Sequence, residues 1–244
     1  MLFTALYAPL PLNVYTDQHI EPLCEALGKD GQHSFHFTQG TIPIDVPEEF
    51  GNFFGPPPNF TFLETTDQAN LMRHLRHFPH RDTPEETLRY AVEKGGIPVY
   101  HNIQVVLKQL SQVVEQEDVD GIIGYSEGGR LAASLLLEEE RRLKETGRQP
   151  RIKFAVFFGG WQPVHPISQK DIFADESEER ITIPTCHVIG TYDPYLQGSL
   201  CLYNFCDPEK AELFDHGAGH VVPRERRVVQ ELAETIQEML PANS

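Results

Sequence analysis

The sequence is poor in cysteine and in positive charge, and it lacks a long apolar run. Four cysteines in 244 residues are too few for a disulfide-based scaffold, which favours a reducing compartment, and we expect the cytoplasm. No two of them form a C-x-x-C pair, and none pairs with a nearby His-x₃-His, so the sequence predicts neither a zinc site nor another cofactor. These cysteines are Cys24, Cys186, Cys201 and Cys206.

The absence of a long apolar stretch and the excess of acid exclude further classes. No segment approaches about 18 apolar residues, so no membrane-spanning helix is expected. The first residues carry no basic cluster, and Pro9 and Pro11 interrupt their apolar run, which predicts a first strand and not a signal peptide. Lys and Arg number 20 against 36 Asp and Glu, a net charge of −16. That charge argues against nucleic acid or an anionic membrane as partner.

The remaining sequence alternates short apolar runs with amphipathic segments. Near-continuous apolar runs such as IKFAVFF are typical of strands buried on both faces. Strands alternating with helices predict an α/β fold, a doubly wound, mostly parallel sheet with helices on both faces, in one domain over 1–244. We expect strands near 2–7, 33–37, 119–125, 152–158, 184–189 and 211–214, and helices near 17–27, 102–114, 127–144 and 224–240.

Two segments in the first half interrupt this alternation. Residues 39–60 are dense in Gly, Pro and Phe and predict a long loop without regular structure. Residues 67–96 have helical spacing, and Thr83-Pro84-Glu85-Glu86 is typical of a helix start, with Thr83 as N-cap.

The segment GYSEG, with Ser126 at its centre, carries the strongest chemical signal. It is a G-x-S-x-G pattern between a predicted strand and a predicted helix. The turn there is so sharp that the serine takes strained backbone angles, and side chains two residues to either side would collide, hence Gly124 and Gly128. The Ser126 hydroxyl then projects at the carboxyl edge of the sheet. The N–H of Glu127, at the helix start, points to where an oxyanion would form.

A nucleophilic serine needs a base and an acid that orients it. Asp193 lies just after the strand predicted at 184–189, where such an acid belongs, although an Asp before Pro194 could instead cap a turn. For the base, His220 is favoured in the loop DHGAGH, and His216 in the same loop remains the competitor. His187 falls inside a predicted strand.

Two other charged clusters have simpler interpretations. His74, His77 and His80 alternate with arginines and predict a solvated basic patch more readily than a metal site. The run 138–142, EEERR, places acids three and four residues before bases, which is typical of a salt-bridged helix face.

With these residues in view, the chain resembles the FSH-type serine hydrolases of fungi. They are a branch of the α/β-hydrolase fold that includes esterases and thioesterases of polyketide gene clusters. The resemblance implies Ser126 as nucleophile, Asp193 as orienting acid and His220 as base, with residues 66–100 as a lid-like insertion over the pocket. It extends from about residue 40 to the C-terminus and is carried by GTIPIDVPEEFGNFFGPPPNFTFLE, GIIGYSEGGRLAASLLLEEE, FAVFFGGWQP, ADESEERITIPTCHVIGTYDPY and LFDHGAGHVVPR.

One segment departs from that family. Its members usually carry a Leu-His-Gly-type turn after the first strand, and a backbone N–H there completes the oxyanion hole. Here the turn has Ala8 between Tyr7 and Pro9, and prolines lack the N–H donor. Either Ala8 or Leu10 supplies the second donor, or the hole is weakened, which would cost roughly 10²–10³ in rate.

The sequence thus predicts a serine hydrolase that cleaves an ester or thioester of a polyketide-like acyl substrate in fungal secondary metabolism. The substrate could be presented by a carrier protein of a polyketide synthase. Phe53, Phe54 and Trp161 are candidates for an apolar pocket, although such aromatic residues also serve as core. Two alternatives stay open. The same three residues could perform cyclisation, condensation or elimination, or the fold could serve as a non-catalytic binding protein.

Overall fold

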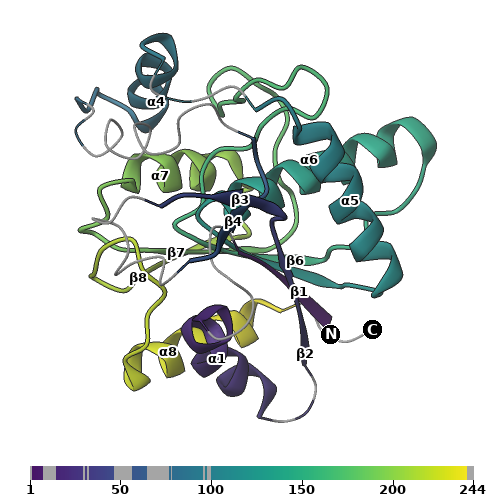
Figure 1. Cartoon of the computed structure of the whole chain (residues 1–244), viewed down its shortest axis with the longest axis vertical. Coiled ribbons are helices and arrows are strands. Elements are labelled where there is room, and N and C mark those ends of the chain that lie inside the picture. The colour runs from purple at the N-terminus through teal and green to yellow at the C-terminus, as the bar shows by residue number, and fades with distance from the viewer. Residues whose placement is uncertain are drawn as a thin grey trace.

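A six-stranded parallel sheet forms the centre of the molecule in the computed structural model (Figure 1). The structure describes residues 2–7, 15–29, 31, 33–46, 57–64, 77, 79–95, 97 and 100–240, with backbone only at 2–7 and 15–19. The strand order is β2-β1-β5-β6-β7-β8, and every neighbouring pair is parallel. The strands are β1 (Leu2–Tyr7), β2 (Ser34–Gln39), β5 (Gly121–Tyr125), β6 (Phe154–Phe158), β7 (Thr185–Ile189) and β8 (Ala211–Asp215).

Helices cover both faces of this sheet, as predicted. Figure 1 shows α1 (Tyr15–Gly28) and α8 (Arg226–Met239) together below it, with α5 (Ile103–Gln116) and α6 (Glu127–Thr146) above. Helices α1, α5 and α6 lie in crossovers between parallel strands, whereas the chain from β6 to β7, which is described throughout, crosses without a helix. Helices on both faces of the sheet give the doubly wound arrangement. The α/β fold predicted from the sequence is therefore confirmed, with element boundaries shifted by a few residues.

Side chains along the central strands alternate between the two faces of the sheet, so the sheet separates two hydrophobic cores. In β6, Ala155 and Phe157 pack on the α5–α6 side, whereas Phe154, Val156 and Phe158 pack on the α1–α8 side. All five residues of this strand are buried. Because β6 is covered on both faces, none of its side chains faces water, which is why its sequence is a continuous apolar run.

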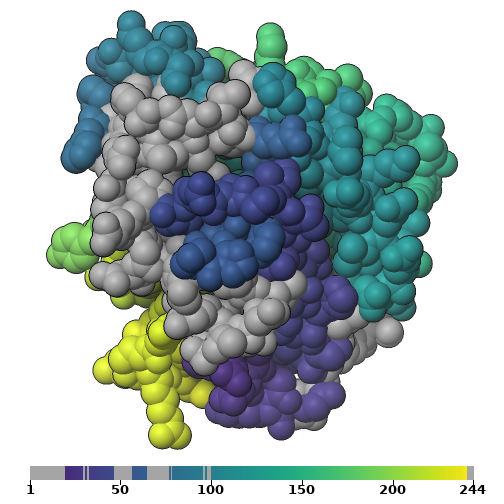
Figure 2. All heavy atoms as spheres, viewed as in Figure 1, coloured from purple at the N-terminus to yellow at the C-terminus, as the bar shows by residue number. Residues whose placement is uncertain are grey.

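The structure corrects two expectations. Residues 39–60 are not wholly irregular, because β3 (Ile42–Ile44) and β4 (Asn59–Thr61) pair as a two-stranded antiparallel ribbon that lies on the front of the molecule in Figure 2. An additional helix, α7 (Leu196–Phe205), was not predicted. Its apolar residues lie around most of its circumference because both sides are packed, so it has no amphipathic period.

Helix α4 (Pro84–Glu93) begins as the sequence predicts. The Thr83 hydroxyl accepts a hydrogen bond from the Glu86 N–H at 3.1 Å, and Pro84 occupies the first turn. Helix α4 packs against α7. The lid proposed for 66–100 stays a prediction, since residues 65–76 lie outside the described part. Within the described residues, no helix is both long enough and apolar enough to span a membrane.

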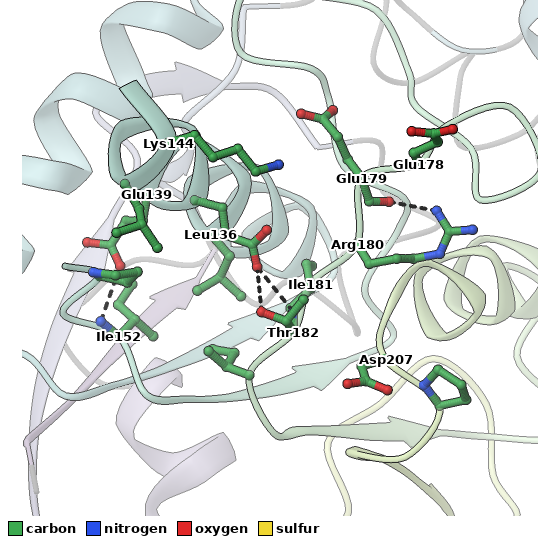
Figure 3. Close-up of a pocket in the computed structure, with 15 residues that line it drawn as sticks. Leu136, Glu139, Lys144, Ile152, Glu178, Glu179, Arg180, Ile181, Thr182 and Asp207 are labelled. Atoms are coloured by element: carbon green, nitrogen blue, oxygen red, sulfur yellow. Dashed lines mark hydrogen bonds between the residues drawn. The ribbon is translucent and has the colours of Figure 1, made fainter. Parts of the chain in front are cut away.

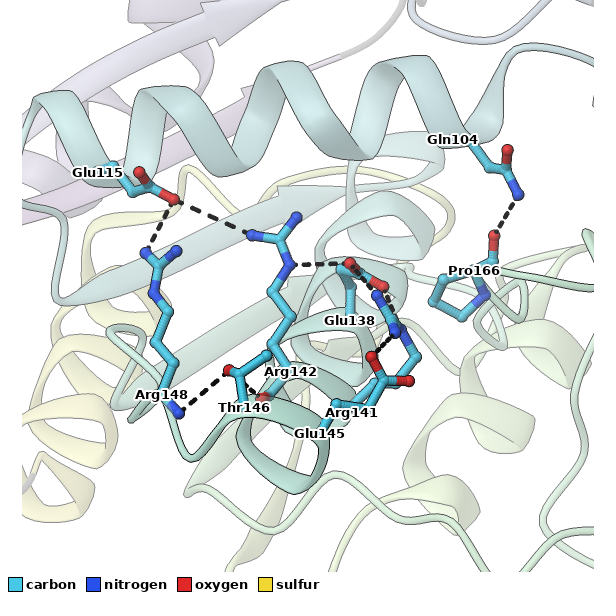
Figure 4. A network of polar contacts seen from close by, with 9 residues as sticks. All are labelled: Gln104, Glu115, Glu138, Arg141, Arg142, Glu145, Thr146, Arg148 and Pro166. Carbon is cyan, nitrogen blue, oxygen red and sulfur yellow. Dashed lines mark hydrogen bonds and ion pairs between the residues drawn. The ribbon is translucent and has the colours of Figure 1, made fainter.

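The acidic–basic run on α6 forms a network with its neighbours (Figure 4). Glu138 accepts hydrogen bonds from Arg141 and Arg142, each at 2.8 Å. Glu139 and Glu140 act differently, because they accept backbone N–H groups of Ile152 and Thr182 at 3.2 Å. The predicted salt-bridged face is therefore real, and two of its acids also hold the chain that enters the sheet.

Candidate active site

Ser126 lies at the strained strand-to-helix turn that its sequence context predicts. Its φ of 53° and ψ of −113° are unusual for a residue with a side chain. It directly follows β5 and is the N-cap residue of α6, but its side chain makes no capping hydrogen bond. The strain therefore presents the hydroxyl at the carboxyl edge of the sheet without committing it to the helix.

Glycines permit this turn because backbone approaches backbone. A Cβ on Gly124 would lie 2.5 Å from the Cα of Gly129 and 2.6 Å from the Gly128 carbonyl oxygen. A Cβ on Gly129 would lie 2.7 Å from the Cα of Gly160, in the chain that follows β6. Real Cβ atoms do not approach so closely. The sharp strand-to-helix turn at Ser126, the nucleophile elbow, therefore requires glycine at positions 124 and 129.

Asp193 and His220 form a buried hydrogen-bonded pair. Asp193 Oδ2 lies 2.6 Å from His220 Nδ1, and both side chains are at most 6% exposed. The other carboxyl oxygen, Oδ1, accepts the N–H of Tyr195 at 2.7 Å. Asp193 therefore makes both contacts that the sequence suggested: its carboxylate holds the imidazole of His220 and also caps the turn before α7.

The loops that carry these two residues are locked together. The Tyr192 N–H donates to the Ala218 carbonyl at 3.0 Å. A Cβ on Gly190 would lie 2.1 Å from that same oxygen, so the two loops touch through their backbones. This contact brings the loop after β7 and the loop after β8 to one place, as parallel strands β7 and β8 require.

Three residues that the sequence did not single out surround His220. The Tyr125 hydroxyl donates to the His220 carbonyl at 3.0 Å, and the Tyr125 ring centroid lies 5.3 Å from the imidazole centroid. Tyr195 packs edge-on at 5.1 Å. A Cβ on Gly159, where φ is +54°, would lie 2.6 Å from His220 Cε1. The double glycine that follows strand β6 was the available signal for this close approach.

Shared neighbours link the Asp193–His220 pair to Ser126. Tyr125 precedes Ser126 in the chain and contacts the His220 ring. The Ser126 N–H donates to the Phe158 carbonyl at 2.9 Å, and the next residue, Gly159, supports the imidazole. A serine at such an elbow, next to an imidazole held by a carboxylate, is the arrangement that can activate a hydroxyl as a nucleophile.

The competing histidines have other surroundings. His187 lies inside β7, and burial lowers its pKa to about 3. His216 is half-buried, and burial lowers its pKa as well. No contact between His216 and Asp193 comparable to that of His220 occurs among the described residues, so geometry favours His220. Nor does any group of three His, Cys, Asp or Glu in that part of the chain have the placement of a metal site.

The remaining candidate residues are placed only in part. The N–H of Glu127 lies in the first turn of α6, as expected for an oxyanion donor. Trp161 is half-buried, contacts Tyr195 at 6.3 Å between ring centroids, and lines a small cavity between α4 and the start of α7. Ala8, Phe53 and Phe54 lie outside the described residues.

A larger cleft of about 590 Å³ lies elsewhere (Figure 3). It is formed by the last turns of α6 and the chain that enters β6, β7 and β8, and it has an apolar floor and an acidic rim. Ser126, Gly159, Asp193 and His220 all follow strands of a parallel sheet, so they gather at the opposite edge. Chemistry in this fold is expected at the carboxyl ends, away from this cleft. The labelled lining residues in Figure 3 are Leu136, Glu139, Lys144, Ile152, Glu178, Glu179, Arg180, Ile181, Thr182 and Asp207.

Comparison with known proteins identifies the family. The family model described as Serine hydrolase (FSH1) matches residues 15–232. The chain belongs to this serine hydrolase family. Among its members, the yeast Saccharomyces cerevisiae protein Family of serine hydrolases 2 is 26% identical over 202 residues, which cover 81% of this chain and 79% of that one. Hydrolase phiM of a fungal species is 28% identical over 220 residues, 89% of this chain and 85% of that protein.

Several fungal esterases match a shorter part. Esterase FPY3 of Fusarium mangiferae is 28% identical over 138 residues, 52% of this chain and 60% of the esterase. The match to probable esterase azaC of Aspergillus niger covers 53% of that protein. The alignments therefore span only about half to three-fifths of these curated esterases.

Solved structures support the fold. Arabidopsis thaliana SOBER1 L63A covers 99% of both chains with a TM-score of 0.51 at 16% identity. A protein of unknown function from Agrobacterium tumefaciens, Atu2452, covers 96% of this chain and 90% of its own with a TM-score of 0.53 at 13% identity. The chain has the α/β-hydrolase fold.

Proposed function

We propose that this protein is a serine hydrolase that cleaves an ester or thioester bond. The observation that supports it most is the buried Asp193–His220 hydrogen bond beside the elbow that holds Ser126. Membership in the serine hydrolase family supports the same reaction class. A buried carboxylate bonded to Nδ1 holds the imidazole in the tautomer whose Nε2 can accept the serine proton.

The reaction proceeds in two halves. His220 takes the proton of the Ser126 hydroxyl as its oxygen attacks the acyl carbonyl, and Asp193 stabilises the imidazolium through Nδ1–H. The N–H of Glu127 donates to the oxyanion. The proton then passes from His220 to the leaving alkoxide or thiolate, which leaves an acyl-serine. His220 takes a proton from water as it attacks that ester; the bond from the acyl carbon to Ser126 Oγ then breaks, His220 returns the proton to Oγ, and the free acid departs.

The proposed substrate carries an apolar, polyketide-like acyl chain. Trp161 and Tyr195 give this side of His220 an aromatic wall, which supports an apolar acyl group near the reacting carbon. The cavity that they line with α4 measures only about 20 Å³, so the acyl chain is proposed to lie along this wall and not inside the cavity. Relatives named as esterases support an oxygen ester, and presentation by a carrier protein would make the substrate a thioester. The cytoplasmic location remains a prediction.

Hydrolysis of a panel tests this function. Purified wild-type protein and the Ser126→Ala variant are assayed against aryl esters and acyl thioesters of increasing chain length. We expect turnover by the wild type that rises with apolar chain length, and a loss of about 10⁴-fold or more in Ser126→Ala. Unchanged activity in the variant would exclude the serine mechanism.

A second candidate uses the same residues without hydrolysis, for cyclisation, condensation or elimination on a polyketide intermediate. Pro9 and Pro11, which follow β1 in the sequence and carry no backbone N–H, favour it because a weaker oxyanion hole slows acyl transfer most. Mass analysis of products separates the two. Hydrolysis gives products whose summed mass exceeds that of the substrate by one water. The product of cyclisation without release of an acid contains no added water.

A further inference from the structure

The side chain of Glu127 is tied to the chain that follows strand β4. Its carboxyl oxygens Oε1 and Oε2 lie 2.8 and 2.7 Å from Thr61 Oγ1, and Oε1 accepts the Phe62 N–H at 2.9 Å. These contacts join positions 65 and 66 residues apart in sequence. Glu127 is thus fixed at both ends, by the helix through its backbone and by residues 61–62 through its side chain.

The partner segment is itself rigid. Thr61 is 1% exposed, and its hydroxyl accepts the Leu63 N–H at 3.3 Å while it donates to Glu127. On the other side, the Asn102 amide donates to the Phe62 carbonyl at 2.8 Å and accepts the Glu64 N–H at 3.0 Å. Residues 61–64 therefore form a firm support, since their backbone groups are held by side chains from α6 and from the start of α5.

The carboxyl of Glu127 is held by neutral donors. Arg130, one turn further along α6, forms an ion pair with Asp171, which also accepts a hydrogen bond from Gln162 at 3.0 Å. Burial raises the pKa of Glu127, and the hydrogen bonds from Thr61 and Phe62, together with the nearby charge of Arg130, oppose that rise. A carboxyl in this setting costs free energy to desolvate, and attraction to the helix N-terminus alone would not require it to be buried.

We propose that Thr61 and Glu127 form a positioning tie that fixes the oxyanion-donating N–H of Glu127 for transition-state binding. The inference rests on the proposed function. An oxyanion donor contributes only when it is held at hydrogen-bond distance from the oxygen of the tetrahedral intermediate, before that charge develops. The turn at Ser126 holds the backbone of Glu127 from one side, and the tie adds a second constraint through the side chain.

The test compares Thr61→Val with Thr61→Ser. Valine keeps the shape but loses the hydroxyl, whereas serine keeps the hydroxyl. Both variants and the wild type are assayed with an aryl ester, and their affinity for a trifluoromethyl ketone, which forms an oxyanion on binding, is measured. We expect kcat of Thr61→Val to fall about tenfold or more with KM within about twofold, and Ki for the ketone to rise by the same factor. Thr61→Ser should restore both values to within about threefold.

A second variant covers loss of folding. Should Thr61→Val not fold, Glu127→Ala removes the same tie from the helix side and keeps the backbone N–H; the same fall in kcat and rise in Ki are expected. Where both fold, the double variant should be no worse than the poorer single variant, because one interaction is lost in each case.

Two results would overturn the inference. A folded variant without the tie whose kcat is within twofold of wild type would remove it and leave the proposed function intact. A fall in kcat without weaker ketone binding would do the same. A wild-type protein that neither turns over the ester nor binds the ketone overturns the proposed function and this inference together.

Discussion

Asp193 serves two purposes with its two carboxyl oxygens. Oδ2 bonds the imidazole of His220, and Oδ1 accepts the N–H of Tyr195 at the start of the chain into α7. Because the turn contact fixes the carboxyl plane, the oxygen that faces His220 cannot rotate away. The same carboxylate therefore holds the turn and orients the His220 imidazole.

Asp193→Asn should separate these two roles. The asparagine oxygen can still accept the Tyr195 N–H, so the fold should persist. Its NH₂ group would face His220 Nδ1 and force the tautomer that cannot take the serine proton. We expect kcat/KM for an ester to fall by about 10²–10⁴ with a small change in Tm. A variant within threefold of wild type would contradict the orienting role.

Gly159 supports the imidazole by having no side chain. A Cβ there would lie 2.6 Å from His220 Cε1, so Gly159→Ala should displace the ring and lower kcat strongly. Gly147→Ala is the matched control. Gly147 also has a positive φ, +72°, but a Cβ there meets nothing within 4 Å. Both variants carry backbone strain, so Tm should fall in both, and ester hydrolysis should fall only in the first. Equal activities in the two variants would remove the support role.

At the scale of elements, the sequence predicted those parts that obey a simple period. The strand-to-helix turn was readable because the G-x-S-x-G pattern stands between a strand and a helix; the structure requires glycine at 124, as predicted, and also at 129, which the sequence did not single out. The strands β5 and β6 were readable because burial on both faces gives a near-continuous apolar run, and β7 was readable although it buries Thr185 and His187. Helix α7 was missed because packing on both sides erases the amphipathic period, and the β3–β4 ribbon was missed because its strands have only three residues each.

Contacts between distant loops could not be predicted in this way. The approach of Gly159 to His220, and of Gly190 to Ala218, depends on how β6, β7 and β8 lie side by side. The tie between Thr61 and Glu127 likewise joins a short ribbon strand to a helix start. The sequence indicates that a glycine or an acid is present, but only the fold assigns its neighbour.

Helix α6 carries a pH-dependent contribution through Glu138. Burial alone would raise the pKa of this carboxyl, but hydrogen bonds from Arg141 and Arg142 outweigh it and lower the pKa below 4.5. A depressed pKa stabilises the folded state above the unfolded value, and the contribution disappears as the pH falls through the folded value.

Glu138→Gln should therefore destabilise the protein most above about pH 5, and the difference from wild type in urea unfolding should shrink as the pH falls below 4.5. Glu145→Gln is the control, because Glu145 pairs with Arg141 but is 54% exposed, and exposed pairs contribute little. A difference between wild type and Glu138→Gln that does not vary with pH would contradict the assignment.

At the scale of the whole molecule, a single parallel sheet explains why the site lies where it does. The loops after four adjacent strands, β5 to β8, deliver Ser126, Gly159, Asp193 and His220 to one edge. The acidic residues that give the net charge of −16 lie partly in other regions of the molecule. Some of the acidic residues lie on α6 and around the cleft at the other edge of the sheet, away from the candidate site, where they suit solubility more than recognition of an apolar acyl group.

The central claim is that folding makes Ser126 an activated nucleophile. Labelling with a fluorophosphonate, followed by peptide mass spectrometry, tests it most directly. We predict one adduct per folded chain, on the peptide that contains Ser126, absent from Ser126→Ala and from urea-unfolded wild type, and slowed in Asp193→Asn. A folded wild-type chain without an adduct, or an adduct of equal yield in Ser126→Ala, would contradict the account.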